Sequence, residues 1–528
     1  MIDKTANTEK EMDIYSIIYI AVCLLCMPTA LRYDMQMFQL SSYRYSRYFR
    51  WWFPTNILTH RKWWTIIIAL CMLSKWLVAV AAALVAASIY KELTEKYKTP
   101  IVFTMRVKRL YATAILLVAA IVAITALTAG VSALPVAAAA TLLLSNFVVL
   151  LANVINTPIE KCITRWYYND AKRIIESHKN LIIIGVTGSF GKTSTKNYLA
   201  QVLSEKFNVL VTPGNFNTLL GVVRTIREQL RPYHQVFIVE MGAKQQGDIK
   251  EICDLVHPRI GILTAIGEMH LETFKSFENI QKTKFELIDS LPANGTAVLN
   301  FDSAGIREYK GRKSVCETVT YSVDCAGTVL RAGDVKYDAS GVSFVINGDG
   351  EVYESKLFGS GNLLNILASI AVAEKLGVPL QKQKNAIARL RPVEHRLSLR
   401  RTNGISVLDD AYNSNPTGAA MAIEVLKNFG IGEANKRIII TPGFVEMGER
   451  QYEANRNLGR QIAGGCDYAI VVNATNRDAI KSGIDEGGMA GDKVYLAADL
   501  NDAHAHLATI LKVGDVVLYE NDLPDNFK

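Results

Sequence analysis

The sequence predicts N-terminal transmembrane helices followed by two α/β domains, the first of which binds phosphate. Three observations predict this fold class. Apolar residues are concentrated in the first 155 positions. From about residue 160, short apolar runs alternate with helical stretches, which is typical of a parallel sheet with right-handed crossovers. A glycine-rich loop with Gly191, Lys192 and Thr193 follows the first of these runs.

Residues 1–158 are predicted to form a membrane-anchoring region of three to four apolar helices. The apolar segments are 14–31, 65–90, 110–128 and 131–154, and each is close to the length of a span. Lys75 is the only charge in the second segment. The mixed, acidic start differs from the basic start of a cleaved signal peptide and favours an anchor. Residues 32–63 have the Arg, Tyr and Trp content of a membrane interface.

The basic residues favour anionic lipid as a partner rather than nucleic acid. The net charge is +8, and Lys and Arg cluster at 44–62 and 91–109, beside apolar segments. If the region after 155 is cytoplasmic, the positive-inside rule fits the 91–109 loop. The same orientation places the basic 32–63 loop outside, against the rule. Either the first segment and this loop lie partly in the interface, or one segment is re-entrant. The predicted location is the cytoplasmic membrane, with several spans and the catalytic domains in the cytoplasm.

The eight cysteines indicate a reducing compartment. Their scattered spacing suggests no disulfide framework. Cys23 and Cys26 form a C-x-x-C inside an apolar run, where packing is favoured over redox chemistry because a redox pair needs an exposed, electropositive setting.

A phosphate-binding loop is predicted directly after the apolar run 181–186, which has the β-branched content of a buried parallel strand. N–H groups at the start of the following helix would face the phosphates, Lys192 would neutralise them, and the Thr193 hydroxyl would hold Mg²⁺. The predicted nucleotide-binding residues here are Gly188, Ser189, Gly191, Lys192, Thr193 and Ser194. Val186 stands where the common pattern has glycine. The alternative is a glycine-rich turn that opens an ordinary helix.

Two side chains follow neighbouring strand-like runs. Glu240 follows the run 236–239, and His270 lies after the run 260–264. Ligands of open α/β sheets lie at the carboxyl ends of strands, so Glu240 can complete a magnesium site and His270 is predicted to be functional. The alternatives are a surface glutamate and a structural histidine.

The remaining soluble sequence divides into two parts. Further strands of the first sheet are predicted at 208–212 and 296–300, followed by an antiparallel insertion or edge within 315–357 and a helix at 362–376. The predicted domains are 159–396 and 397–528. The strands expected in the second domain are 405–409, 437–441, 468–472 and 515–519.

Five motifs in order carry a resemblance to a known family. They are Thr187-Gly-Ser-Phe-Gly-Lys-Thr193, Gly214-Asn-Phe-Asn217, Glu240-Met-Gly242, His270-Leu-Glu-Thr-Phe274 and Asp409-Asp-Ala-Tyr-Asn-Ser-Asn-Pro416. Over about residues 180–520 the chain resembles the Mur ligase family, and most of all the members that add a dipeptide to a peptidoglycan precursor. The resemblance implies a central P-loop ATPase domain and a C-terminal Rossmann-like domain that closes over it. It also implies ATP, two Mg²⁺ ions, and ligation of an amine to a carboxylate through an acyl phosphate.

The resemblance assigns catalytic roles to Lys192, His270 and Lys284. Lys192 would bind the β- and γ-phosphates, while Thr193, Glu240 and His270 would hold magnesium. Lys284 matches the family lysine that is carbamylated and helps hold the second magnesium. From the sequence alone, Lys284 would be interpreted as a solvated helix lysine.

The resemblance also places residues around the base and the acceptor. Asn362 and Asn365 match the adenine-side asparagines, although Gly361 stands where the family has histidine. Arg396 and Asp410 match residues that contact the nucleotide across the domain cleft. The incoming amine would face Tyr412, Asn413 and Asn415.

Two departures bear on the substrate. Membrane segments replace the family's N-terminal domain, which grips the uridine-nucleotide end. The C-terminal stretch Val516-Val-Leu-Tyr-Glu-Asn-Asp-Leu-Pro524 lacks the usual Lys-Gly-Ser. The expected function is an ATP-dependent carboxylate–amine ligase of cell-envelope precursor synthesis, with an amine or dipeptide acceptor. The alternatives are ligation or amidation of lipid-linked precursors or of a capsular polyamide, a membrane-anchored ATPase, and a scaffold with a dead site.

Overall fold

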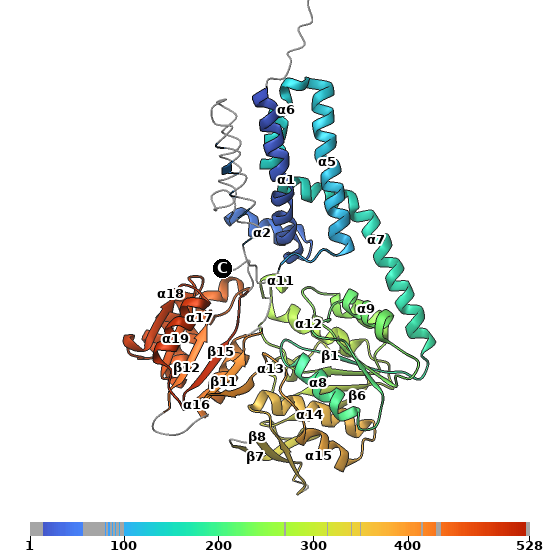
Figure 1. The fold of residues 1–528 in the computed structure, drawn as a ribbon. Coiled ribbons are helices and arrows are strands. Elements are labelled where there is room, and N and C mark those ends of the chain that lie inside the picture. The colour runs from blue at the N-terminus through green and yellow to red at the C-terminus, as the bar shows by residue number, and fades with distance from the viewer. Residues whose placement is uncertain are drawn as a thin grey trace, which may run out of the picture. The chain divides into compact units, whose positions relative to one another are not determined.

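The computed structural model describes residues 14–55, 100–268, 271–313, 315–338, 341–348, 350–412, 415–428 and 435–523, with isolated positions between 80 and 94. These residues form two compact units, the first ending at Arg165 and the second running from Trp166 to Leu523. Figure 1 shows the helices of the first unit and the two sheets of the second.

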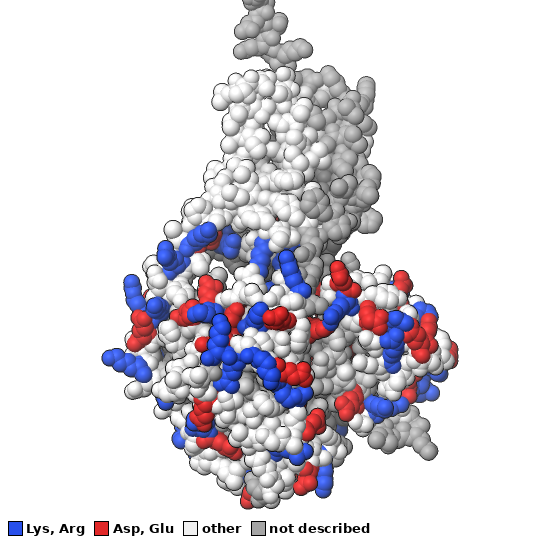
Figure 2. All heavy atoms as spheres, turned by 180° about the vertical axis from the view of Figure 1, so that it is seen from behind, with Lys and Arg blue, Asp and Glu red and all other residues white. Residues whose placement is uncertain are grey.

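The first unit is built from apolar helices. By length and composition, three of them are able to cross a membrane: α1 (Ile14–Leu40), α5 (Met105–Ala129) and α7 (Ser145–Ser177). The shorter helices are α2 (Tyr45–Thr55), η3 (Val131–Ala133) and α6 (Leu134–Leu143). The face of these helices seen in Figure 2 shows almost no charged residue, in contrast to the second unit.

The predicted apolar segments are found as helices wherever the structure describes them. Segments 14–31 and 110–128 lie within α1 and α5, and Cys23 and Cys26 are free and buried in the core of this unit. The predicted span 65–90, with Lys75, lies almost wholly outside the described residues. The apolar segment predicted at 131–154 is also helical, but Leu144 divides it into η3 with α6 and the beginning of α7.

Buried polar contacts explain this break and join the helices. Leu144 adopts φ −99° and ψ 21°, and the next residue, Ser145, donates from Oγ to Asp34 Oδ2 at 2.6 Å. In the same unit, Arg109 binds Glu160 in a bidentate manner at 2.7 and 2.9 Å. Ionisable groups among apolar helices are normally paired in this way.

The second unit begins with a nine-stranded sheet in the order β2-β3-β1-β4-β5-β6-β7-β8-β9. Its parallel strands are β1 (Ile182–Thr187), β2 (Val209–Val211), β3 (Val236–Glu240), β4 (Ile260–Leu263), β5 (Thr296–Asn300) and β6 (Glu317–Ser322). β1 pairs with β3 on one side and β4 on the other, so Val186 lies opposite both Glu240 and Ile262. The carboxyl ends of these three strands therefore meet at one edge.

Helices cover both faces of this sheet. One face packs against α8 (Lys192–Leu203), α14 (Ser360–Lys375) and α15 (Leu380–Ala388). The other packs against α9 (Leu219–Gln229), α10 (Asp248–Val256), α12 (Phe277–Asp289) and the end of α7. The short helices are α11 (Leu271–Phe274) and α13 (Ala304–Arg307).

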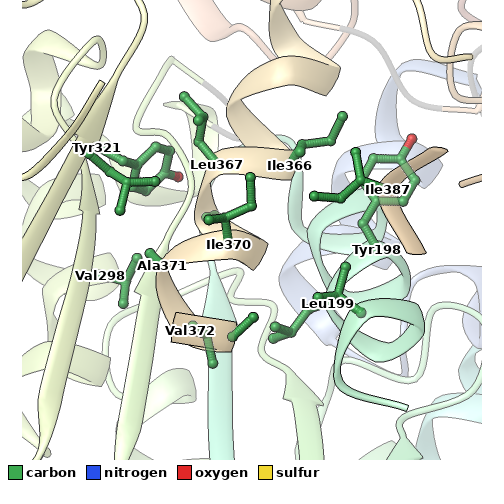
Figure 3. Close-up of a cluster of buried hydrophobic side chains, with 14 of the residues drawn as sticks. Tyr198, Leu199, Val298, Tyr321, Ile366, Leu367, Ile370, Ala371, Val372 and Ile387 are labelled. Atoms are coloured by element: carbon green, nitrogen blue, oxygen red, sulfur yellow. The ribbon is translucent and has the colours of Figure 1, made fainter. Parts of the chain in front are cut away.

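The apolar face of α14 fixes α8 against the sheet. Figure 3 shows Ile366, Ile370 and Val372 among the buried side chains, with Tyr198 and Leu199 of α8 to one side. Val298 of β5 and Tyr321 of β6 lie on the other side of α14. This packing holds the start of α8 at the carboxyl edge of β1.

The region 315–357 differs in part from the prediction. The strands β7 (Leu330–Asp338), β8 (Gly341–Ile346) and β9 (Val352–Ser355) pair antiparallel, as predicted. β6, however, pairs parallel with β5 and extends the main sheet. Its Tyr321 is buried against α14, which explains why this largely polar strand belongs to the core.

The smaller sheet has the order β10-β11-β15-β12-β13-β14. The strands are β10 (Ser398–Thr402), β11 (Ile405–Asp410), β12 (Arg437–Thr441), β13 (Tyr468–Val472), β14 (Val494–Ala497) and β15 (Val516–Glu520). All pairs are parallel except β10 with β11. The helices are α16 (Pro416–Asn428), η4 (Gly448–Arg450), α17 (Gln451–Gly465), α18 (Arg477–Glu486), η5 (Gly491–Lys493) and α19 (Leu500–Ile510).

The predicted fold class is confirmed: apolar helices precede two α/β parts. The predicted strands of both sheets are present, whereas β6, β10 and β14 were not individually predicted. The predicted boundary after residue 158 falls inside α7, and the one after residue 396 falls between α15 and β10.

Candidate active site

Hydrogen bonds to the segment after β4 hold the loop between β1 and α8 in place. Ser189 N donates to Ala265 O at 2.7 Å, and Ser189 Oγ lies 3.0 Å from Gly267 O. Gly191 caps α8 with φ +81°, so the first turn of α8, with Lys192, Thr193 and Ser194, directly follows the loop. Backbone N–H groups at such a helix start bind phosphate well.

Lys192 is folded back onto this loop. Its Nζ donates to Gly188 O at 2.7 Å and to Ser189 O at 3.0 Å. Burial, together with the positive charge of Arg396, lowers the pKa of Lys192 to about 8, although Glu240 acts in the opposite direction. The ammonium is therefore available at the site where the loop would meet phosphate.

Glu240 ends β3 and is buried beside the first turn of α8. Its Oε2 accepts from Thr193 Oγ1 at 3.1 Å and from Lys196 Nζ at 2.9 Å, and its Oε1 accepts from Asn217 Nδ2 at 3.0 Å. Burial alone would raise the pKa of Glu240, but Lys196 and Lys192 hold it below its ordinary value. Glu240 is therefore a carboxylate at neutral pH.

Lys196 is a buried residue of this site that the sequence analysis missed. It is 1% exposed, and its Nζ also donates to Thr212 O at 2.8 Å and Gly214 O at 2.7 Å. A signal for it exists: Lys196 lies four residues after Lys192, and residues with this spacing share one face of a helix.

Lys284 lies on α12 and is 4% exposed. Burial, together with the positive charge of Lys192, lowers the pKa of Lys284 to about 7, although Glu286 and Asp248 oppose the shift. A solvated helix lysine, as the sequence alone suggests, would not be buried in this way. Lys192, Glu240 and Lys284 thus belong to one electrostatic environment.

The oxygen ligands present fit a magnesium ion. The Thr193 hydroxyl and the ionised Glu240 carboxylate lie side by side, and Mg²⁺ prefers such hard oxygen ligands while keeping several waters. Within the described part of the chain, no group of three His, Cys, Asp or Glu side chains is placed to hold a metal. His270 lies outside the described residues, so its predicted role stays a prediction.

Asn362 and Asn365 project from the start of α14 toward α8. Asn362 Oδ1 accepts from Tyr198 OH at 2.9 Å, and Asn365 Oδ1 accepts from Thr195 Oγ1 at 3.0 Å. Both asparagines therefore brace the helix that carries the phosphate loop. At Gly361, where the family has histidine, a Cβ would lie 3.2 Å from Met421 Sδ of α16, so glycine allows close packing.

Arg396 and Asp410 lie where the second α/β part begins. The Arg396 guanidinium stands 4.2 Å from the Tyr412 ring centre, and Leu397 N donates to Asp410 Oδ1 at 3.0 Å. Burial raises the pKa of Asp410 to about 6, against the effect of Arg396.

A cavity of about 480 Å³ beside this linker is lined by Lys356, Leu357, Phe358, Pro392, Leu397, Leu399 and Arg401. None of the predicted site residues lines it.

Two side-chain contacts join the α/β parts at the site. Asn215 Nδ2 donates to Tyr412 OH at 2.6 Å, and Arg450 pairs with Glu268. Asn413 lies outside the described residues. Asn415 is buried, and its Oδ1 accepts from two backbone N–H groups at the start of α16, which is a capping role.

Gly188 offers a direct test of the loop. It has φ +152°, and a Cβ there would lie 2.1 Å from Thr264 Oγ1 and 3.0 Å from backbone atoms of Ala265. Gly188→Ala is therefore expected to weaken Mg²⁺–ADP binding about ten- to a hundredfold, as backbone strain of this kind implies. Calorimetric titration measures the affinity. Gly464→Ala is the control, since nothing lies within 4 Å of a Cβ there; equal affinities for the two variants would contradict the loop assignment.

Comparisons with known proteins match both α/β parts. Residues 186–373 match the Mur ligase middle domain, and residues 395–519 match the Mur ligase, glutamate ligase domain. The chain is 31% identical to the UDP-N-acetylmuramoyl-tripeptide–D-alanyl-D-alanine ligase of Synechocystis sp. over 64% of this chain and 71% of that protein. It is 32% identical to the Mycobacterium tuberculosis ligase of the same name, over 64% and 70% of the two chains.

Solved structures agree on the fold. The MurF ligase of Thermotoga maritima in complex with ADP superposes with a TM-score of 0.60 at 28% identity, over 68% of this chain and 80% of that one. MurF of Acinetobacter baumannii gives a TM-score of 0.61 at 23% identity, over 68% and 77%. The similarity therefore lies in the second unit, from the phosphate loop to the smaller sheet.

Proposed function

This chain belongs to the Mur ligase family, and from that membership we propose how its residues carry out ligation and on which substrate. It is an ATP-dependent ligase of peptidoglycan-precursor synthesis that forms an amide bond between a carboxylate and an amine. We propose that the carboxylate ends a muramoyl-linked peptide and that the amine is a D-alanyl-D-alanine-type dipeptide. The observation that supports this most is that Lys192, at the start of α8, lowers both the pKa of Glu240 at the end of β3 and the pKa of the buried Lys284.

The proposed reaction has two steps. A substrate carboxylate oxygen attacks the γ-phosphorus of ATP, the bond to the bridging oxygen breaks, and ADP leaves. The amine nitrogen then attacks the carbonyl carbon of the acyl phosphate, the bond to the phosphate oxygen breaks, inorganic phosphate leaves, and the amine proton passes to solvent. Because two anions must meet in the first step, positioning and charge neutralisation dominate the catalysis.

The residues divide this work. Lys192 would turn from its carbonyl contacts to the β- and γ-phosphates, and the backbone N–H groups at the start of α8, after Gly191, would face the same phosphates. Thr193 and Glu240 would hold magnesium, which supplies charge neutralisation between the phosphates and the carboxylate. Arg396 and Asp410 would face the nucleotide from the second α/β part.

Lys284 is proposed to be carbamylated, as in the family. With its pKa lowered to about 7, much of this amine is neutral at pH 7.5, and the neutral amine is the nucleophile that attacks carbon dioxide. Attack forms the N–C bond and releases the amine proton, which leaves a carbamate. The new anion would supply a further oxygen ligand for a second magnesium.

We further propose that the substrate is lipid-linked and that the chain is anchored in the cytoplasmic membrane. Three helices able to cross a bilayer support this, and both family matches begin after them, at residues 186 and 395. The anchor would keep the active site near a bilayer-bound peptide.

A competition assay tests this choice. Full-length protein in anionic liposomes is given ATP, Mg²⁺, D-Ala-D-Ala, and equal amounts of UDP-linked and polyprenyl-linked muramoyl-tripeptide. Mass spectrometry is expected to show amide product on the lipid-linked peptide at least about tenfold faster, as a large gain in effective concentration implies. Efficient use of the UDP-linked peptide alone would overturn the lipid proposal and leave the ligase intact. ADP release without any amide product would instead favour a membrane-anchored ATPase.

A further inference from the structure

Lys196 occupies an unusual place for a lysine. Its side chain is 1% exposed, and its Nζ makes three contacts: 2.9 Å to Glu240 Oε2, 2.8 Å to Thr212 O and 2.7 Å to Gly214 O. A lysine ammonium has three N–H groups, so this buried cation is fully satisfied. Burying a charge costs free energy unless the charge is paired and hydrogen-bonded. The contacts of Lys196 offset this cost, and they also fix the position of the groups that Lys196 binds.

The contacts of Lys196 join two structures that carry different parts of the reaction. Lys196 itself belongs to α8, one turn after Lys192 and Thr193. Its carbonyl partners belong to the loop after β2, which runs from Thr212 to Asn217. No other side chain of α8 in the described part of the chain is seen to donate to this loop.

The 212–217 loop makes hydrogen bonds to Glu240, the proposed magnesium ligand, and to Tyr412 of the second α/β part. Thr212 Oγ1 accepts from Glu240 N at 3.0 Å, and Asn217 Nδ2 donates to Glu240 Oε1 at 3.0 Å. Between these two residues, Asn215 Nδ2 donates to Tyr412 OH at 2.6 Å, which is one of the contacts that join the α/β parts. Gly214, whose carbonyl Lys196 holds, directly precedes Asn215.

We propose that Lys196 is a positioning residue that transmits nucleotide occupancy at α8 to the 212–217 loop, and through Asn215 to Tyr412 of the second α/β part. The proposal rests on the proposed function, because it takes the start of α8 as the nucleotide site. Lys196 touches neither nucleotide nor substrate; it acts through Glu240 and the Gly214 carbonyl. A nucleotide that fixes α8 would thereby fix the loop that meets the acceptor side.

Hydrogen exchange on the full-length protein measures this coupling without any ligase turnover. In the wild type, saturating Mg²⁺–ADP is expected to slow amide exchange both at 188–195 and at 213–218. In Lys196→Met, the factor by which Mg²⁺–ADP slows exchange at 213–218 is expected to fall at least about tenfold, because the charge-assisted contacts of Lys196 are lost. The slowing at 188–195 is expected to be largely kept. Lys196→Arg keeps the charge and is expected to restore part of the effect.

Lys206→Met is the matched control. Lys206 Nζ also donates to two backbone carbonyls, Leu376 O at 2.9 Å and Gly377 O at 2.8 Å, but it has no carboxylate partner among the described contacts. Its exchange pattern and turnover are expected to match the wild type. In ligase assays, Lys196→Met is expected to lower kcat about tenfold with little change in the KM for ATP, since the nucleotide contacts themselves are retained.

A second variant covers the case in which Lys196→Met does not fold, since it leaves the buried Glu240 without its closest cation. Lys196→Met/Glu240→Gln removes both charges and is expected to fold; at an Mg²⁺–ADP concentration that still protects residues 188–195, its 213–218 response is expected to stay lost. Nucleotide-induced protection of 213–218 that persists in either folded variant would overturn the proposal. If the wild type binds Mg²⁺–ADP but makes no amide product, the ligase function fails while this coupling is still measured.

Discussion

Replacing Lys192 by alanine is expected to lower kcat/KM for amide formation at least about 10³-fold, because a cation aimed at developing charge in a dry site contributes this much or more. The Lys192 side chain is half-buried and sits on the loop that would bind the phosphates, with its Nζ 2.7 Å from Gly188 O. The measurement is the rate of ADP and amide formation over a range of substrate concentrations, followed by mass spectrometry.

Lys206→Ala is the control for this variant. Lys206 has the same pattern of two carbonyl contacts, but it follows the C-terminal end of α8, and its partners lie at the end of α14. The control should keep full turnover, and both variants should divide between the membrane and soluble fractions in the same proportion as the wild type. Turnover by Lys192→Ala within a few-fold of the wild type would remove the central assignment of the phosphate loop.

Lys284→Met is expected to abolish most activity while leaving the fold more stable. The variant loses the proposed carbamate, and turnover should fall about 10²- to 10³-fold, as loss of a charged group at a metal site does. In buffer free of carbon dioxide and magnesium, where Lys284 carries no carbamate, methionine fills a similar volume without a buried ammonium, so thermal unfolding should occur at higher Tm. If Lys284→Met loses activity while its Tm rises, the loss of activity cannot be attributed to unfolding.

The pH dependence of this stability change has a definite sign. The folded-state pKa of Lys284 is lowered to about 7, so the unfolded chain binds the proton more tightly. The penalty of the buried ammonium is fully present below pH 7 and is relieved as pH rises above it. The Tm gain of Lys284→Met should therefore be largest below pH 7 and shrink toward pH 10.

Lys282→Met provides the control on the same helix. Lys282 is exposed and pairs with Glu278 at 2.8 Å. Its loss should change neither turnover nor the pH dependence of Tm. Unchanged turnover in Lys284→Met, with both proteins folded, would contradict the role given to Lys284.

The strands that bear the site were predictable because their sequences are short, apolar and β-branched. β1 and β3 are nearly continuous apolar runs, as buried parallel strands require. β6 has the sequence Glu-Thr-Val-Thr-Tyr-Ser, whose alternating polarity is shared by antiparallel edges. Only its tertiary packing, with Tyr321 buried against α14, places it in the parallel sheet.

Site residues were predictable where a motif fixes both the residue type and its place in the fold. They were not predictable where only burial in the packed structure identifies them. Lys192 and Thr193 follow from the glycine loop, and Glu240 follows from its position at a strand end. Lys196 could have been found from its spacing of four residues after Lys192, whereas the burial of Lys284 depends on which face of α12 meets the sheet, and no spacing along the chain reveals that face. The bracing of α8 by Asn362 and Asn365 likewise required the packed structure.

The two carbonyl contacts of Lys192 mean that an arriving nucleotide swaps hydrogen bonds instead of adding them. Two of the three N–H groups of this ammonium are in use, so it can bind both the β- and γ-phosphates only if Gly188 O or Ser189 O loses its contact. The net gain in affinity is then only the difference between the old and new partners. Because negative charge on the transferring group shifts during the reaction, this lysine should contribute more to the speed of phosphoryl transfer than to the tightness of the resting complex.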